Sequence, residues 1–298
     1  MKNIYIVYHK IDFDGVCSAA IVYWSLKKYN NIHNIFFVPI NYGDVFDLWD
    51  KVDMDDTVYM VDFSLPIKDL IALNNLTNLI LIDHHKTIVN DIQKSGIEFN
   101  GIQKSGIGAC YLTYNFINEM IDKSDPFCPD KYEYVPYAIE LLAKYDVWDL
   151  DDPNALTLQY ALRCIDDIFD PTNEIWKKIV FNEIDIYRLI DKGRIAQQYD
   201  KVSNAKYCDT VAFDSELDGY KLLCVNKALG SSIIFESIWD NTKYDIMCCF
   251  YRVKGTWNAS FYTDKEGVDV GELAKKYGGG GHKQAAGIAS VRELPFDV

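Results

Sequence analysis

An aspartate and two histidines follow directly on an apolar run, and their side chains could bind a metal ion or transfer protons. They are Asp83, His84 and His85, which come after the apolar residues 79–82. A short, continuously apolar run is typical of a strand that is buried on both faces of a parallel sheet. Ligands of such sheets gather at the carboxyl ends of the strands, where these three residues would lie. A hydrogen-bonded structural pair of imidazoles is the alternative.

The same arrangement of an apolar run and a polar end occurs at two earlier places. One run ends at His9, with Asp12 and Asp14 soon after it, and another ends at Asp62. Each aspartate alone would be explained as a helix cap or a turn, because Asp is common at both. Asp146, just after a predicted helix, would by default be a surface turn. As a set, however, the strand-end residues indicate a metal site, and Asp12 and Asp14 could each face a different cation.

The predicted ligands are carboxylates and imidazoles, with no thiolate among them. Such a set favours Mn²⁺ or Mg²⁺, with Co²⁺ or Fe²⁺ also suited, over structural zinc.

A second segment that could bind a ligand is the glycine-rich one at residues 278–287 (Gly-Gly-Gly-Gly-His-Lys-Gln-Ala-Ala-Gly). Glycines let a backbone approach a ligand closely and offer N–H groups to an anion. His282 and Lys283 add two further donors. We predict substrate binding at Gly279, Gly280, Gly281 and His282; a flexible hinge is the alternative.

The elements that must position these residues alternate in the first half of the chain. Strands are predicted at residues 4–8, 35–38, 58–61 and 79–82, and helices at residues 16–28 and 67–73. This alternation predicts an α/β fold with a parallel sheet.

The rest of the chain is predicted as helices followed by a smaller mixed α/β region. The helices are at residues 110–121, 134–144 and 176–198, the last broken near Gly193. Strands at residues 210–213, 221–225, 245–251 and 256–262 then precede a helix at residues 270–277. We predict a metal-binding domain at residues 1–190, a linker at 191–205 and a substrate-binding domain at 206–298.

Composition limits the classes of partner. The chain has 298 residues and a formal charge of −14, so a large basic face for long duplex nucleic acid is not expected. No apolar stretch is long enough to cross a membrane, and the apolar start is too short for a signal peptide. The eight cysteines form no Cys-x-x-Cys pair and are interpreted as reduced thiols. We therefore expect a cytoplasmic protein without a membrane partner; whether it forms a homodimer is left open.

In their order along the chain, these motifs resemble those of the DHH phosphoesterase family, which is named for the Asp-His-His motif and includes oligoribonucleases, nucleotide phosphatases and exopolyphosphatases. The stretch from His9 through Asp12 and Asp14, then Asp62, residues 83–85 and Asp146, is similar to its successive motifs. Residues 278–287 resemble the signature of the DHH-associated C-terminal domain.

The resemblance implies a bilobed enzyme with a cleft between the lobes and two divalent cations, Mn²⁺ first among them. By carry-over, His9 and Asp12 bind the first cation, Asp62 bridges the two, and the second is bound by Asp14, His84 and Asp146. His85 would contact the scissile phosphate or protonate the leaving group, and Asp83 would fix the loop or a histidine tautomer.

The implied activity is hydrolysis of short nucleotide phosphate esters: short oligonucleotides, linear dinucleotides or 3′-phosphoadenosine 5′-phosphate. An arginine that nucleotide-binding members carry before the glycine loop is replaced here by Tyr262, and Arg252 on the adjacent predicted strand is a substitute. An exopolyphosphatase or pyrophosphatase is the alternative activity, followed by a non-catalytic nucleotide-binding protein.

Overall fold

The computed structural model describes residues 3–29, 34–124 and 134–298. Contacts within the chain divide it into two compact units, Met1–Ala196 and Gln197–Val298. Each unit is described by itself below.

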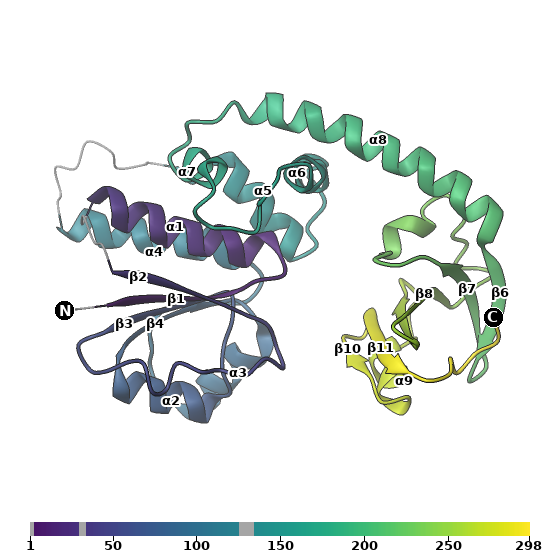
Figure 1. Ribbon diagram of the computed structural model, residues 1–298, viewed down its shortest axis with the longest axis horizontal. Coiled ribbons are helices and arrows are strands. Elements are labelled where there is room, and N and C mark those ends of the chain that lie inside the picture. Colours follow the sequence, from purple (N-terminus) through teal and green to yellow (C-terminus); the bar gives the residue numbers. More distant parts are fainter. Residues whose placement is uncertain (1–2, 30–33, 125–133) are drawn as a thin grey trace. The chain divides into compact units, whose positions relative to one another are not determined.

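The N-terminal unit is built on a sheet of five parallel strands, which confirms the predicted α/β class (Figure 1). The strands lie in the order β2-β1-β3-β4-β5. Their bounds are β1 Ile4–His9, β2 Ile35–Ile40, β3 Thr57–Val61, β4 Asn78–Asp83 and β5 Asn100–Gln103. The predicted strands correspond to β1, β2, β3 and β4, whereas β5 is an additional edge strand.

Burial explains why the central strands were recognisable in the sequence. All five residues of β3 are buried, and only one residue of β1 and one of β4 are not. These strands are covered on both faces, so both side-chain rows are apolar. Strand β2 lies at the edge of the sheet and contains Pro39, which cannot donate a ladder hydrogen bond and is tolerated at an edge.

The strand order creates a switch point between β1 and β3. These strands are neighbours, but the chain passes from β1 to β2 on one side and from β3 to β4 on the other. In open parallel sheets a crevice forms at this place, beyond the carboxyl ends of the two strands. The topology therefore specifies where a site is expected.

Helices cover both faces of the sheet (Figure 1). On one face α1 packs beside α4, and α5, α6 and α7 complete that core. On the other face α2 and α3 cover a second, smaller core. The bounds are α1 Phe13–Tyr29, α2 Ile67–Leu76, α3 Lys86–Ser95, α4 Ala109–Ser124, α5 Tyr137–Asp146, α6 Asn154–Arg163 and α7 Glu174–Val180.

Three details of the predicted helices were wrong. Helices α3 and α6 were not predicted, although α3 carries Ile88, Val89 and Ile92 at helical spacing. The break predicted near Gly193 is absent from the described chain, since α8 (Ile186–Val211) runs through it. Residues 191–205, predicted as a linker, belong to the same helix. Residues 210 and 211, predicted as strand, end this helix.

The C-terminal unit is a mixed sheet of six strands in the order β10-β11-β9-β8-β7-β6. Only β7 and β8 pair in parallel; the other neighbours are antiparallel. The bounds are β6 Phe213–Leu217, β7 Tyr220–Asn226, β8 Ile246–Val253, β9 Thr256–Tyr262, β10 Gly280–Gly281 and β11 Ala285–Val291, with a 3₁₀ turn at Ser232–Phe235 and helix α9 at Val270–Lys276. This is the mixed α/β region that the sequence predicts.

Two further expectations concern the whole chain. The seven cysteines in the described residues are free, and all but Cys164 are buried; Cys128 lies outside the described residues. Within the same residues, no helix combines the length and the apolar character that spanning a bilayer requires.

The larger core of the N-terminal unit can be tested at Trp176. Its side chain is 0% exposed and its indole N–H donates to the carbonyl of Ile168 at 2.8 Å. Trp176→Ala should lower the free energy of unfolding by about 3–5 kcal/mol, because a large cavity forms and a buried carbonyl loses its donor. The exposed Tyr187→Ala should cost less than about 1 kcal/mol. Urea unfolding measures both, and equal losses would contradict this assignment of the core.

Candidate metal centre

The predicted site residues of the N-terminal unit lie around the switch point of the sheet. His9 is the last residue of β1, Asp62 follows β3, and His84 follows β4. Because β1, β3 and β4 are parallel neighbours, their ends lie along one edge of the sheet. Asp12 and Asp14 lie at the start of α1, and Asp146 is the last residue of α5.

These residues converge into three overlapping groups that could hold metal ions. In each group, one ligand atom from every residue lies within 4.8 Å of the others. The groups are His9, Asp12 and Asp62; Asp14, His84 and Asp146; and Asp62, His84 and His85. The first two coincide with the ligand sets expected for two cations, and Asp62 Oδ1 lies 3.2 Å from His84 Nε2. The structure thus brings together all six residues that the sequence predicts as metal ligands.

Asp62 is the residue that best fits a cation. Its side chain is 1% exposed, and both carboxylate oxygens are buried without a hydrogen bond from any described residue. The Nδ1 atom of His9 is also buried and lacks such a bond, although it lies 2.6 Å from Asp12 Oδ2 and 3.7 Å from Asp62 Oδ2. An ionised carboxylate is costly to bury alone, and a bound cation would satisfy these atoms.

The backbone of Asp62 is also unusual, with φ at +53°. Such left-handed geometry is uncommon outside glycine, and Asp and Asn tolerate it best. Conformations of this kind gather at functional sites, where the surrounding structure holds them.

Asp12 serves as both a helix cap and a site residue. One carboxylate oxygen accepts the N–H of Gly15 at 2.9 Å, which is the capping pattern of a helix start, and the other faces His9. Gly15 is required by close approach, because a Cβ there would lie 2.1 Å from the carbonyl oxygen of His9. The start of α1 can therefore lie directly against the end of β1. The helix-cap explanation of Asp12 is therefore confirmed, and the position of its second oxygen is compatible with the predicted role as a metal ligand.

Asp14 is held by the N-terminus of another helix. Its two carboxylate oxygens accept the N–H groups of Ala109 at 2.6 Å and Cys110 at 2.8 Å, the first residues of α4. A helix N-terminus favours negative charge through its unpaired N–H groups and its dipole. The contact also explains how a carboxylate with 1% exposure is retained.

His9 is oriented by a residue that the sequence analysis missed. Its Nε2 lies 3.0 Å from the side-chain oxygen of Asn41. When Nε2 donates to Asn41, Nδ1 keeps its lone pair and faces Asp12 and Asp62. Asn41 follows directly on β2, so the pattern of a polar residue after an apolar strand could have revealed it.

His85 is oriented by Asp83, which is fully buried. Asp83 accepts from the backbone N–H of His85 at 2.9 Å and lies 2.7 Å from its Nδ1, and it also accepts from the Ser64 hydroxyl. The His85 side chain is 33% exposed, so its Nε2 edge remains available to a ligand. The ring of Tyr42 lies 5.8 Å from that of His85, and no pattern in the sequence pointed to this tyrosine.

Burial and mutual repulsion dominate the electrostatics of the carboxylates. Burial raises the pKa of Asp62 to about 7, although His84 and His9 beside it act in the opposite direction. Burial also raises the pKa of Asp14 well above its usual range, and the charges of Asp62 and Asp146 add to the effect.

The two imidazoles respond to the same charges. Burial opposes protonation of His9, but Asp12 and Asp62 outweigh it and raise its pKa to about 10. Burial likewise opposes protonation of His84, and Asp146 and Asp62 raise its pKa to about 11. The aspartates therefore favour the protonated form of both histidines, and a bound metal would require the neutral imidazoles in its place.

The predicted residues of the C-terminal unit fall into two places. Gly279 packs tightly on β11, because a Cβ there would lie 2.0 Å from the carbonyl oxygen of Gly287. Gly280 and Gly281 form β10, with Gly280 facing open space, and His282 is exposed. Gly280 and Gly281 thus pair with Gly287 and Ala286 of β11 in a short antiparallel hairpin.

Arg252 is not brought to the glycine segment. Gly281 pairs with Ala286, which is in register with Phe261 and Cys248, whereas Arg252 lies four residues farther along β8. Its guanidinium lies 5.6 Å from the ring of Trp257 and donates to the carbonyl of Gly255 at 3.5 Å.

Comparisons with known proteins agree with this description. Residues 3–139 match the model of the DHH family, N-terminal domain. Uncharacterized protein R106 of Acanthamoeba polyphaga mimivirus is 24% identical over 315 residues, which cover 95% of this chain and 66% of that protein. The chain thus spans just under two thirds of the length of this relative.

Two solved structures share the fold at low sequence identity. The pGpG-specific phosphodiesterase PggH from Vibrio cholerae has a TM-score of 0.53 and 15% identity, covering 96% of this chain and 92% of that one. An exopolyphosphatase-related protein from Bacteroides fragilis has a TM-score of 0.51 and 14% identity, covering 96% and 86%. The family match identifies residues 3–139 as a DHH-family N-terminal domain.

The role of Asp62 can be tested by Asp62→Asn, which keeps the shape and tolerates the left-handed backbone. At pH 8, above the raised pKa of Asp62, the buried charge costs stability in metal-free protein, so the variant in EDTA should melt at the wild-type temperature or higher. Mn²⁺ at 100 times its Kd should stabilise the wild type by about 2.7 kcal/mol, a rise in melting temperature of roughly 5–10 °C. The variant should lose this rise.

The matched control is Asp167→Asn. Asp167 is an exposed aspartate with φ at +54° and lies outside the three groups. It should keep the full response to Mn²⁺ in differential scanning calorimetry. A full response in Asp62→Asn would disprove a metal site at Asp62.

Asn41 offers a test of ligand orientation. Asn41→Leu removes the acceptor for His9 Nε2 and should weaken Mn²⁺ binding by about 10- to 100-fold, as loss of such supporting contacts typically does. Asn41→Asp keeps an acceptor and should bind Mn²⁺ at least as tightly as the wild type. Calorimetric titration measures both affinities, and identical affinities in the Leu and Asp variants would show that the contact is not needed.

Proposed function

We propose that this protein is a hydrolase, a two-metal-dependent phosphoesterase that acts on short nucleotide phosphate esters. The observation that carries the proposal is the buried Asp62 carboxylate, which has only the imidazoles of His84 and His9 beside its oxygens, accepts no backbone N–H in the described chain, and lies between two His/Asp groups. Such an arrangement suits a ligand that bridges two cations. The DHH-family match of residues 3–139 supports the same class of reaction.

In this proposal His9 and Asp12 hold one cation, and Asp14, His84 and Asp146 hold the other, with Asp62 shared. Mn²⁺ is the proposed metal, because the donor set contains carboxylates and imidazoles without thiolates. When bound, the cations would supply Lewis-acid activation of water and neutralise charge on the phosphoryl oxygens.

His85 is the proposed catalytic group that acts on the substrate. Because Asp83 lies at its Nδ1 and accepts its backbone N–H, the ring is held with the opposite nitrogen directed outward. That nitrogen can donate a hydrogen bond to a phosphate oxygen or a proton to the leaving group. Asp83, whose pKa is kept low by His85 despite burial, fixes the orientation of the ring and acts as a positioning residue.

A short nucleotide is the proposed substrate rather than a long strand. The chain's charge of −14 disfavours an extended phosphate backbone, which needs clustered basic residues. The Vibrio protein of the same fold is described as pGpG-specific, which supports a linear dinucleotide. We propose that residues 206–298 present this substrate through Gly279, Gly280, Gly281 and His282, with Arg252 at a more distant contact.

An exopolyphosphatase or pyrophosphatase activity is the second candidate. It is supported by the Bacteroides structure, which is described as exopolyphosphatase-related. A nucleotide-binding protein without activity is a third reading, which requires that the assembled site not turn over any substrate.

A hydrolysis panel with purified protein and Mn²⁺ tests these alternatives. It includes a linear dinucleotide, a five-residue RNA, 3′-phosphoadenosine 5′-phosphate, pyrophosphate and polyphosphate. The dinucleotide should be cleaved, and His85→Ala should reduce kcat by about 10²- to 10⁴-fold, the usual contribution of a positioned acid or base.

The response to Mn²⁺ in calorimetry is the control for folding and metal loading of His85→Ala, which should keep much of it. Cleavage of pyrophosphate or polyphosphate alone would favour the second candidate. Absence of Mn²⁺-dependent turnover for every substrate would refute the phosphoesterase proposal.

A further inference from the structure

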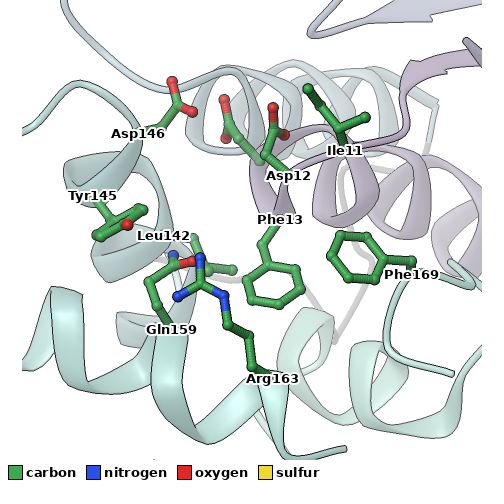
Figure 2. Close-up of a pocket in the computed structure, with 10 residues that line it drawn as sticks. Ile11, Asp12, Phe13, Leu142, Tyr145, Asp146, Gln159, Arg163 and Phe169 are labelled. Atoms are coloured by element: carbon green, nitrogen blue, oxygen red, sulfur yellow. The ribbon is translucent and has the colours of Figure 1, made fainter. Parts of the chain in front are cut away.

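A pocket in the N-terminal unit borders the candidate metal centre and contains residues that the proposed reaction has not used. Its wall includes Asp12, Asp14 and Asp146 (Figure 2). Gln159 and Arg163, both from α6, lie on the side away from these carboxylates. Being four residues apart on a helix, the two side chains share one face of α6. The pocket has a volume of about 70 Å³, room for a tetrahedral anion.

Gln159 is the feature that points to a ligand. It is 2% exposed and lines the pocket, yet its amide makes no hydrogen bond to any described residue. Burying an amide without partners costs free energy, so such groups are usually paired with protein, water or ligand. Its NH₂ group is a suitable donor to an anion in the pocket.

Arg163 provides the positive charge. It is one of five arginines in the chain, and within the described residues it forms no ion pair. Its guanidinium lies 5.8 Å from the ring centre of Phe13, so an aromatic contact supports it in place of a carboxylate. A guanidinium presents paired N–H donors that match a phosphate group.

Among the aromatic residues of the pocket, Phe13 is not available for stacking on a nucleobase. It is 3% exposed, and its ring is covered by Phe169 at 5.1 Å and Trp176 at 6.1 Å. Phe169 itself is 46% exposed, so the choice of a phosphate as ligand rests on the donors of Arg163 and Gln159.

We propose that Arg163 and Gln159 bind a second, non-scissile phosphate of the substrate, beside the phosphate that is cleaved. This inference rests on the proposed phosphoesterase function and narrows its substrate class to short nucleotides with a terminal phosphate. The adjoining carboxylates repel an anion until cations neutralise them, so the pocket accepts phosphate in the metal-loaded protein. Arg163 thereby selects 5′-phosphorylated dinucleotides over dinucleotides that end in a hydroxyl.

The test compares a 5′-phosphorylated dinucleotide with the same dinucleotide lacking that phosphate. Arg163→Gln should lower kcat/KM for the phosphorylated substrate by about 10- to 100-fold, mainly through KM, as expected for loss of a charge-assisted contact. Arg163→Gln should change kcat/KM for the dinucleotide without the 5′-phosphate by about 2-fold or less. Gln159→Met should act in the same direction with a smaller effect.

The matched control is Arg188→Gln, which removes the same charge from an exposed arginine on α8. It should leave the preference for the phosphorylated dinucleotide unchanged. The rise in melting temperature with Mn²⁺ should be the same in wild type, Arg163→Gln and Arg188→Gln, because Arg163 is not a metal ligand. Equal loss for both dinucleotides, or no loss, would overturn the proposal.

A binding measurement separates this inference from the proposed function. A phosphonate analogue of the 5′-phosphorylated dinucleotide, which cannot be hydrolysed, is titrated calorimetrically into the Mn²⁺-loaded proteins. Arg163→Gln should weaken its binding by about the same factor as it raises KM. If the analogue binds in an Arg163-dependent way but no dinucleotide is turned over, the phosphoesterase proposal is refuted and the phosphate site is supported. If dinucleotides are turned over without preference for the 5′-phosphate, the phosphoesterase proposal is supported and the phosphate site is refuted.

Discussion

The repulsion among four aspartate carboxylates is the constraint on which the rest of the N-terminal unit depends. Asp12, Asp14, Asp62 and Asp146 converge at the switch point of the parallel sheet, where water can screen them only in part. Backbone N–H groups and two histidines beside the carboxylates offset this negative charge. The backbone of α4 donates two N–H groups to Asp14, the start of α1 donates one to Asp12, and His9 and His84 lie between the carboxylates. Asp62 accepts no backbone N–H in the described chain, and the groups beside its buried oxygens are the imidazoles of His84, at 3.2 Å, and His9, at 3.7 Å, so it is the carboxylate best suited to a cation.

A second set of contacts orients two imidazoles of the candidate site. Asn41 lies at one nitrogen of His9, and Asp83 lies at one nitrogen of His85, so each imidazole presents its other nitrogen to the site. Asp83 is in turn bound by the Ser64 hydroxyl and is fully buried. Contacts of this kind hold ligands in position before a metal or substrate arrives, which lowers the cost of binding them.

An acidic site can accept an anionic substrate only after its own charge has been neutralised. The pocket beside the candidate metal centre implies that cations bind before an anionic substrate. Asp12, Asp14 and Asp146 form one of its walls, and Arg163 and Gln159 form another. In the proposed function, cations bound at the first wall would neutralise its charge and make the pocket attractive to an anion. The proposal therefore links metal binding and substrate selection through a few charges of the N-terminal unit.

The sequence by itself determined the central strands and the metal-binding residue types. Four of the five residues of the buried strand β3 are apolar, and the polar residue that follows it, Asp62, is recognisable without a structure. Helices α3 and α6 were not predicted, although α3 carries Ile88, Val89 and Ile92 at helical spacing. Only the tertiary structure decided that Asn41 orients His9, and that Gln159 and Arg163 border the carboxylates. The reason is physical: a side chain's donors and charge are set by its covalent structure, whereas its electrostatic partners come from segments that meet only when the sheet and its helices pack.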